Sequence, residues 1–238
     1  MRTLERAGRR TELDTLRGVT ILSMIAYHAC WDLVYLFGAD WPWYHGTLAY
    51  IWQQSICWTF ILLSGYCWPL GRRHLRRGLL AFGGGALVSA VTLLVMPEDG
   101  IFFGVLSLLG TAALVTIPLD PLLRRIPARA GLAGSFLLFL LLRDVNSGYL
   151  GFEGAHLLAL PEGLYRNLFT ACLGFPPAGF HSTDYFSLFP WIFLFLTGYF
   201  LYRLRRVSAM GRHSLVIYLL HQPLVYGALL ALNTILEF

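Results

Sequence analysis

Long apolar runs separated by short polar stretches dominate the pattern of this chain. Most runs approach the roughly 20 apolar residues that a bilayer-spanning helix needs. The pattern therefore predicts an all-α fold, a polytopic transmembrane helix bundle of about seven helices in a single integral-membrane domain. The runs cover about residues 18–38, 48–70, 78–96, 101–119, 131–142, 186–202 and 213–236.

Composition agrees with a membrane class. Hydrophobic residues make up 57% and charged residues 13% of the chain, whereas a soluble domain has about 25% charged residues. The net charge is +5 and every basic residue is an arginine. Because nearly all of them flank apolar runs, membrane orientation explains this charge better than a nucleic-acid partner. The first run is too long for the apolar part of a signal peptide, so we expect it to remain in the mature protein.

Arginine positions predict the orientation. If seven helices alternate, all arginines except Arg143 and Arg166 fall on one side. By the positive-inside rule the N-terminal tail, residues 1–12, is cytoplasmic and the C-terminus lies outside. The weak run is Gly131 to Leu142, about 18 Å as a helix. If this run did not cross, the arginines at 203–212 would move outside.

The connection over residues 143–185 is too long for an idle loop. Within it, PEGLYRNLFTACLGF starts at Pro161 and stops before Pro176 and Pro177. Proline suits the first position of a helix and the residues just beyond its end. The segment is therefore predicted to be an interfacial or re-entrant helix that forms an extracytoplasmic lid between helices five and six.

The first run carries two ionisable residues at depth. His28 lies roughly 16 Å beyond Arg17 along a helix, and Asp32 follows one turn later on the same face. Ionisable groups at that depth normally face a bundle interior or a watery cavity and mark functional sites. A carboxylate beside an imidazole suits general base catalysis. The alternatives are a neutral histidine satisfied by a neighbour and an interfacial aspartate.

The last run brings a second histidine to a similar depth. His221 lies roughly 13 Å inside this run, followed by Gln222 and Pro223. Proline removes a backbone donor and kinks or opens a helix there.

The four cysteines show no ligand or disulfide spacing, so we expect neither a disulfide framework nor a metal.

Several stretches resemble a known family. They are, in order, ELDTLRGVTILSMIAYHACWDL, FILLSGYCWPLG, FFGVLSLLG, FPPAGFHSTDYFSLFPWIFLFLTGY and GRHSLVIYLLHQPLVYG. They look like the bacterial membrane family related to the catalytic domain of heparan-alpha-glucosaminide N-acetyltransferase. An arginine–glycine pair followed by a buried histidine is also similar to the wider group of transmembrane acyltransferases.

The resemblance implies a reaction. An acyl group, typically acetyl, would pass from cytosolic acyl-CoA as co-substrate to an amine or hydroxyl of an extracytoplasmic sugar or glycolipid. It implies a bacterial cytoplasmic membrane, with membrane lipids as partners, and leaves open a homodimer. His28 would act as base or transient acyl carrier with Asp32 orienting it, and His221 with Gln222 would support the site or hold the thioester carbonyl. Phosphate-binding candidates, or else simple positive-inside anchors, are Arg17, Arg72, Arg73, Arg76 and Arg77.

The chain also departs from that family. The lysosomal enzyme is expected to carry asparagine where His28 stands, with its active histidine after the first helix. His45 in WPWYHG is therefore a rival catalytic candidate. Ser107 stands where relatives often carry histidine. His181 and Asp184 either meet the acceptor or cap the helix entering at Phe186.

Two other function classes stay open at this point. A transporter or flippase for a lipid-linked sugar would also need polar groups at mid-membrane and a kinked helix. A catalytically inactive membrane subunit would keep the fold without acyl transfer. Internal symmetry would favour a transporter, and the sequence shows none, whereas two histidines at matched depth favour catalysis.

Overall fold

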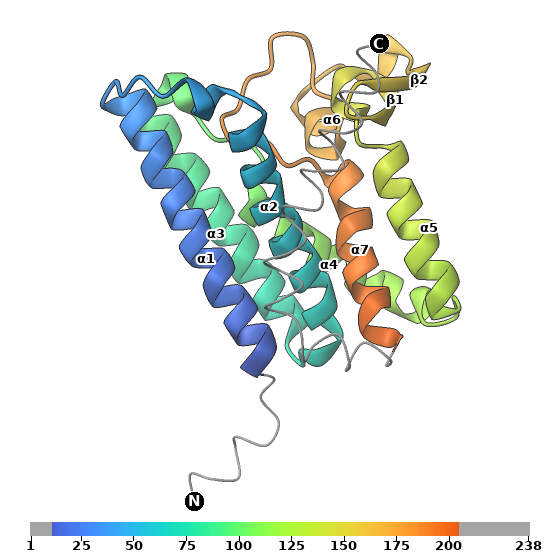
Figure 1. The fold of residues 1–238 in the computed structure, drawn as a ribbon. Coiled ribbons are helices and arrows are strands. Elements are labelled where there is room, and N and C mark those ends of the chain that lie inside the picture. Colours follow the sequence, from blue (N-terminus) through green and yellow to red (C-terminus); the bar gives the residue numbers. More distant parts are fainter. Residues whose placement is uncertain (1–10, 205–238) are drawn as a thin grey trace, which may run out of the picture. The chain divides into compact units, whose positions relative to one another are not determined.

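The structure, a computed structural model, describes residues 11–204 and is dominated by helices (Figure 1). Six predicted spans are confirmed as helices, and the seventh, at 213–236, lies outside the described residues. Contacts divide the chain into two compact units, of which 11–60 and 61–204 are described. We call them the first and the second unit. The helices are α1 (Thr11–Trp31), α2 (Thr47–Cys67), α3 (His74–Val95), α4 (Val105–Leu123), α5 (Ala128–Leu141), α6 (Leu168–Leu173) and α7 (Leu188–Arg203).

Helix length and apolarity support an integral membrane protein. Three helical segments among the described residues are long and apolar enough to cross a bilayer: Glu12–Leu36, His74–Val95 and Val105–Leu123. Helices α5 and α7 are apolar but have only 14 and 16 residues. At 1.5 Å per residue α5 is about 21 Å long, shorter than a hydrocarbon core of about 30 Å. The fifth span is thus the short one, as its sequence predicted.

In the first unit, aromatic side chains join α1 to the chain that follows it. The Tyr44 hydroxyl donates to the carbonyl oxygen of Tyr27 at 3.1 Å, and the rings of the two residues lie 5.4 Å apart. Trp52 of α2 donates its indole N–H to Ser23 Oγ of α1 at 2.8 Å. Buried tyrosine and tryptophan normally need such partners for their polar ends. These contacts fix the connection that carries His45.

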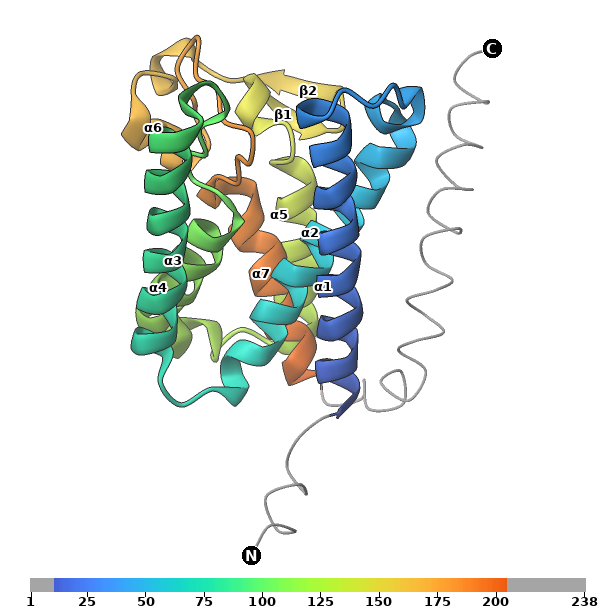
Figure 2. The same ribbon diagram turned by 90° about the vertical axis from the view of Figure 1, so that its left-hand side faces the viewer.

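In the second unit, α3 and α4 lie side by side (Figure 2). Glycines allow this close approach: a Cβ atom at Gly85 of α3 would overlap Ser107, and one at Gly110 of α4 would overlap the backbone of Phe82. Small residues at helix crossings are a common packing device in membranes, where apolarity alone gives no driving force between helices.

Helix α7 is the core of the second unit. Apart from Phe193, every residue from Pro190 to Phe200 is buried. Its neighbours include α5, where Ser135 Oγ lies 3.0 Å from Thr197 Oγ1. A helix that is apolar and buried on all sides is the expected centre of a bundle.

The lid segment, residues 143–185, contains a β-hairpin that the apolar pattern did not predict. Strand β1 (Tyr149–Phe152) pairs antiparallel with β2 (Ala155–Ala159). Its turn is tied to the end of α5, because Arg143 Nε lies 3.0 Å from Glu153 Oε1 and Asp144 Oδ2 accepts from the Gly154 amide at 2.9 Å.

The predicted lid helix over residues 161–175 is too long. Helix α6 is limited to Leu168–Leu173 because Asn167 forms a reciprocal capping box at its start, while Gly174, with φ +127°, ends it. Pro161 instead precedes a single 3₁₀ turn.

The Tyr185 hydroxyl donates to the Ala171 carbonyl at 2.6 Å, and burial raises the pKa of Tyr185 to about 12, which keeps this donor protonated.

Candidate functional site

His28 and Asp32 lie one turn apart on the last part of α1. Both are exposed on the surface of the structure, and within residues 11–204 no hydrogen bond or ion pair joins them. At Asp32 the α-helix gives way to a π-helical turn, Asp32–Leu36, whose first bond runs from the Phe37 amide to the Asp32 carbonyl at 3.1 Å. Such local π turns occur frequently at functional sites. The catalytic roles of the two residues stay predictions.

His45 lies in the same unit, against the π-helical turn. It ends the 3₁₀ turn Pro42–His45, and its Nδ1 atom lies 3.3 Å from the hydroxyl of Tyr35. The two rings meet edge to face with centroids 5.6 Å apart. Both candidate histidines therefore belong to the aromatic end of the first unit, but His45 is held by Tyr35 and makes no described bond to either His28 or Asp32.

Asp184 caps a helix, but a different one from that expected. Its Oδ2 atom accepts a hydrogen bond from the Val105 amide at 3.1 Å, at the start of α4. Helix α7 begins at Leu188, and its N-cap, Ser187, makes no side-chain cap bond. A Cβ at Gly104 would lie 2.7 Å from the Asp184 carboxylate, so glycine at this position makes room for the cap.

The neighbouring lid residues follow the same loop before α4. Ser182 Oγ accepts from the Phe102 amide at 2.9 Å and donates to the Phe102 carbonyl at 3.0 Å. The Phe186 amide donates to the carbonyl oxygen of Phe103 at 2.8 Å. His181 comes just before this hydrogen-bonded segment, residues 182–186, and is exposed. The segment is thus fixed at one end of the second unit while the imidazole of His181 stays accessible.

Most predicted phosphate-binding arginines surround the start of α3. In the first unit, Arg17 lies 3.6 Å from Asp14 one turn earlier in α1. In the second unit, Trp68 stacks on His74 with centroids 4.0 Å apart at the point where α3 begins. The remaining arginines precede or occupy its first turn and are all exposed: Arg72, Arg73, Arg76 and Arg77.

A polar network that the sequence analysis missed lies at the same end of α3, α4 and α7. The Tyr199 hydroxyl donates to Asp120 Oδ1 at 2.6 Å, and Arg124 Nη2 lies 2.7 Å from Asp120 Oδ2. His74 is close enough to act electrostatically on Asp120. The available signal was a lone carboxylate inside an apolar run with an arginine four residues later, the spacing of a helical ion pair.

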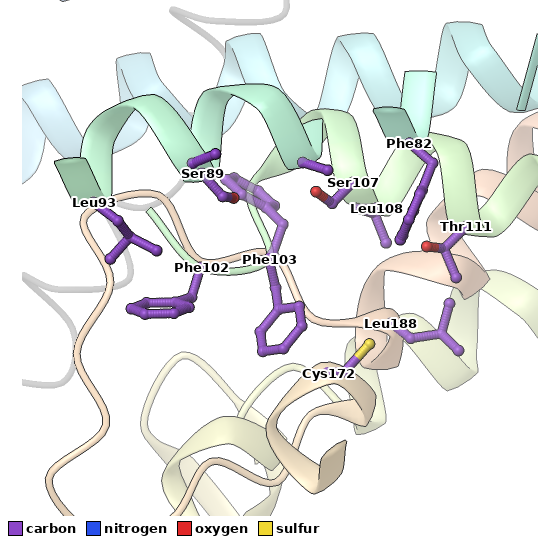
Figure 3. Close-up of a pocket in the computed structure, with 13 residues that line it drawn as sticks. Phe82, Ser89, Leu93, Phe102, Phe103, Ser107, Leu108, Thr111, Cys172 and Leu188 are labelled. Carbon is purple, nitrogen blue, oxygen red and sulfur yellow. The ribbon is translucent and has the colours of Figure 1, made fainter. Parts of the chain in front are cut away.

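A pocket of about 420 Å³ lies between α3, α4, α6 and the start of α7 (Figure 3). Its lining is mainly apolar, with Phe82 of α3, Phe102 and Phe103 of the following loop and Leu188 of α7. Polar atoms come from the hydroxyls of Ser89, Ser107 and Thr111 and the thiol of Cys172. Burial raises the pKa of the Cys172 thiol, which disfavours the reactive thiolate.

Two predicted site residues, His221 and Gln222, lie outside the described residues. Within residues 11–204 no group of three or more histidine, cysteine or acidic side chains is arranged to hold a metal ion.

The apolar helices among residues 11–204, three of them long enough to cross a bilayer, define a polytopic α-helical membrane protein. The chain belongs to the family of the catalytic domain of heparan-alpha-glucosaminide N-acetyltransferase, whose model matches residues 9–223. This confirms the resemblance of the sequence motifs and makes the chain a member of a membrane acetyltransferase-type family. No curated protein and no solved structure matches the chain.

Proposed function

We propose that this protein is a membrane acyltransferase that moves an acetyl group from cytosolic acetyl-CoA to an amine or hydroxyl of an extracytoplasmic sugar or glycolipid. The observation that carries the proposal is the family match, which covers residues 9–223 and so includes every candidate residue. The cytoplasmic N-terminus rests on the arginine distribution.

His28 is the proposed general base. It accepts the proton of the attacking hydroxyl or amine while the acceptor atom forms a bond to the thioester carbonyl carbon. The carbon–sulfur bond then breaks, and the proton passes from the imidazolium to the sulfur of CoA. Asp32, one turn away, stabilises the imidazolium. In a two-step variant the His28 nitrogen attacks the thioester carbonyl carbon, the carbon–sulfur bond breaks and CoA leaves as the thiolate. The acceptor then attacks the acetyl-imidazole, the bond between nitrogen and acetyl carbon breaks, and the acceptor's proton passes to the thiolate.

The other candidate residues bind the two substrates. The exposed guanidinium groups at the start of α3 suit the phosphates of CoA, because arginine binds phosphate oxygens through paired N–H groups. His221 and Gln222 hold the thioester carbonyl. His181 meets the acceptor, and Asp184 fixes the segment that carries it by capping α4.

Turnover by the purified protein tests the proposal. Protein in nanodiscs, supplied with acetyl-CoA labelled in the acetyl group and a panel of amino sugars and alkyl glycosides, is expected to release CoA and label an acceptor. Replacing Arg72, Arg73, Arg76 and Arg77 with glutamine is expected to raise the KM for acetyl-CoA with little change in kcat, as when uniform binding is removed.

The matched control replaces Arg125, just after α4, and Arg129, in the first turn of α5, with glutamine and should leave the KM unchanged. Folded protein that neither binds acetyl-CoA nor releases CoA would contradict the proposal. Movement of a lipid-linked sugar across the bilayer without acetyl-CoA would favour a transporter instead.

A further inference from the structure

One face of α3 lines the pocket in the second unit, and we call the part of the pocket along this face the channel. Phe82, Ala86 and Ala90 are spaced four residues apart and so share a face, and Leu93 continues the wall. From Phe82 to Leu93 this face is about 16 Å long. The two alanines leave space where larger side chains would fill it, and α3 is itself a candidate membrane span. The channel therefore lies along a candidate membrane span.

Hydroxyl groups in the pocket lack the bonds that other hydroxyls of the bundle make. Thr116, Ser135 and Thr197 each donate to the carbonyl four residues earlier, at 2.7, 2.7 and 2.8 Å. Ser107 and Thr111 line the pocket and have no hydrogen-bond partner among residues 11–204. Since a polar group in an apolar setting needs a partner, these two hydroxyls suit the oxygen atoms of a ligand.

One end of the pocket is pre-formed by the loop before α4. Phe103 adopts a left-handed conformation, with φ +56°, which residues other than glycine rarely adopt and which is often kept at ligand sites. Bonds from Ser182 and Phe186 hold this loop in place. Figure 3 shows the ring of Phe103 between α3 and α6. Because the site is already ordered, a ligand that binds here loses little free energy to ordering it.

This end of the pocket also adjoins the proposed acceptor residues. Phe186 lines the pocket and lies two residues after Asp184, which caps α4 just before Ser107. A chain in the channel would place its polar head beside the segment that carries His181. The pocket thus combines an aromatic and aliphatic wall with two unpartnered hydroxyls and an adjoining polar segment. This combination fits an amphiphile rather than a free sugar.

We propose that this pocket holds the aliphatic chain of a lipid-linked sugar, which makes the acetyl acceptor a glycolipid. The inference rests on the proposed acetyl transfer for the identity of the head group, while the binding itself needs no acetyl-CoA. The volume of about 420 Å³ lies within the range of small-molecule sites, about 300–1,000 Å³.

Photo-crosslinking in nanodiscs tests the inference. Two probes are compared, an alkyl glycoside and a phosphatidylcholine, each with a diazirine in its aliphatic chain. The glycoside probe is expected to label peptides containing residues 82–93 and 107–111, and unlabelled alkyl glycoside should compete. Ala90→Trp fills the channel and should lower this labelling about tenfold, the loss that corresponds to about two buried methylene groups.

Controls separate channel filling from misfolding. Leu87→Trp changes the same helix at a side chain that is 65% exposed and does not line the pocket, and it should retain full labelling. If Ala90→Trp does not elute as a single folded species, Thr111→Leu fills the channel from α4 and should give the same loss. Unchanged labelling in a folded channel-filling variant would overturn the inference.

Two further outcomes also overturn it. Equal labelling of these peptides by the phosphatidylcholine probe, without competition by glycoside, would mean bulk lipid only. Absence of label from these peptides in folded wild-type protein would mean that the channel is closed to lipids, for example by another part of this chain. In either case, acetyl transfer to a water-soluble sugar would leave the proposed function standing, so the two failures are distinguishable.

Discussion

Replacing His28 with alanine is expected to reduce acetyl transfer by about 10²- to 10⁴-fold, the usual contribution of a general base. The reason is that no proton acceptor then remains for the attacking hydroxyl or amine at this position of α1. Acetyl-CoA binding should change little, because the exposed arginines at the start of α3 are untouched. Initial rates of labelled acetyl transfer by purified variants in nanodiscs measure the effect, with binding of acetyl-CoA followed separately.

His45→Ala is the matched control, since His45 is the other histidine among residues 11–60 and the rival catalytic candidate that the family resemblance indicates. It should retain most activity, because its Nδ1 atom is already engaged by Tyr35 at 3.3 Å. Added imidazole should partly restore His28→Ala, which a purely structural defect would not allow. If His45→Ala lost transfer while His28→Ala kept it, the base would be His45 and the assignment made above would be wrong.

Gly198→Ala is expected to cause a large loss of stability, about 3 kcal/mol, the upper end of overpacking costs. A Cβ atom at Gly198 of α7 would overlap the carbonyl oxygen of Leu62 and lie 2.8 Å from the amide nitrogen of Tyr66. Backbone atoms of α2 cannot rotate away as a flexible side chain can. Thermal unfolding in detergent, followed by size-exclusion chromatography of heated samples, measures the loss.

Gly134→Ala in α5 provides the control. No atom lies within 4 Å of a Cβ at Gly134, so the substitution should be neutral or slightly stabilising through helix propensity. Equal stability of the Gly198→Ala and Gly134→Ala variants would contradict the close packing of α7 against the end of α2.

The helices were predictable because the length of each apolar run is by itself enough to indicate a helix. The short fifth run, for example, reads as a short helix and is one of 14 residues. The hairpin was not predictable in the same way. All five residues of β2 are exposed, so the strand has no apolar alternation, and its turn depends on Arg143 and Asp144 from the end of α5.

For the candidate site, the spacing of neighbouring residues could be read from the sequence, but contacts between residues far apart in the chain could not. The separation of His28 and Asp32 places them one turn apart without further information. The partners of Asp184 and Asp120 are both 79 residues away, at Val105 and Tyr199. An aspartate before a helix predicts a cap, but only the packing of α4 against the lid segment decides which helix receives it.

The most direct test of acetyl transfer across the membrane uses sided proteoliposomes. Acetyl-CoA, labelled in the acetyl group, is supplied only on the side of the arginines that begin α3, and a sugar acceptor only on the other side. The account predicts labelled acceptor on the far side and free CoA on the donor side, in equal amounts. Folded protein that releases CoA without labelling the far-side acceptor, or that labels only an acceptor on the donor side, would contradict it.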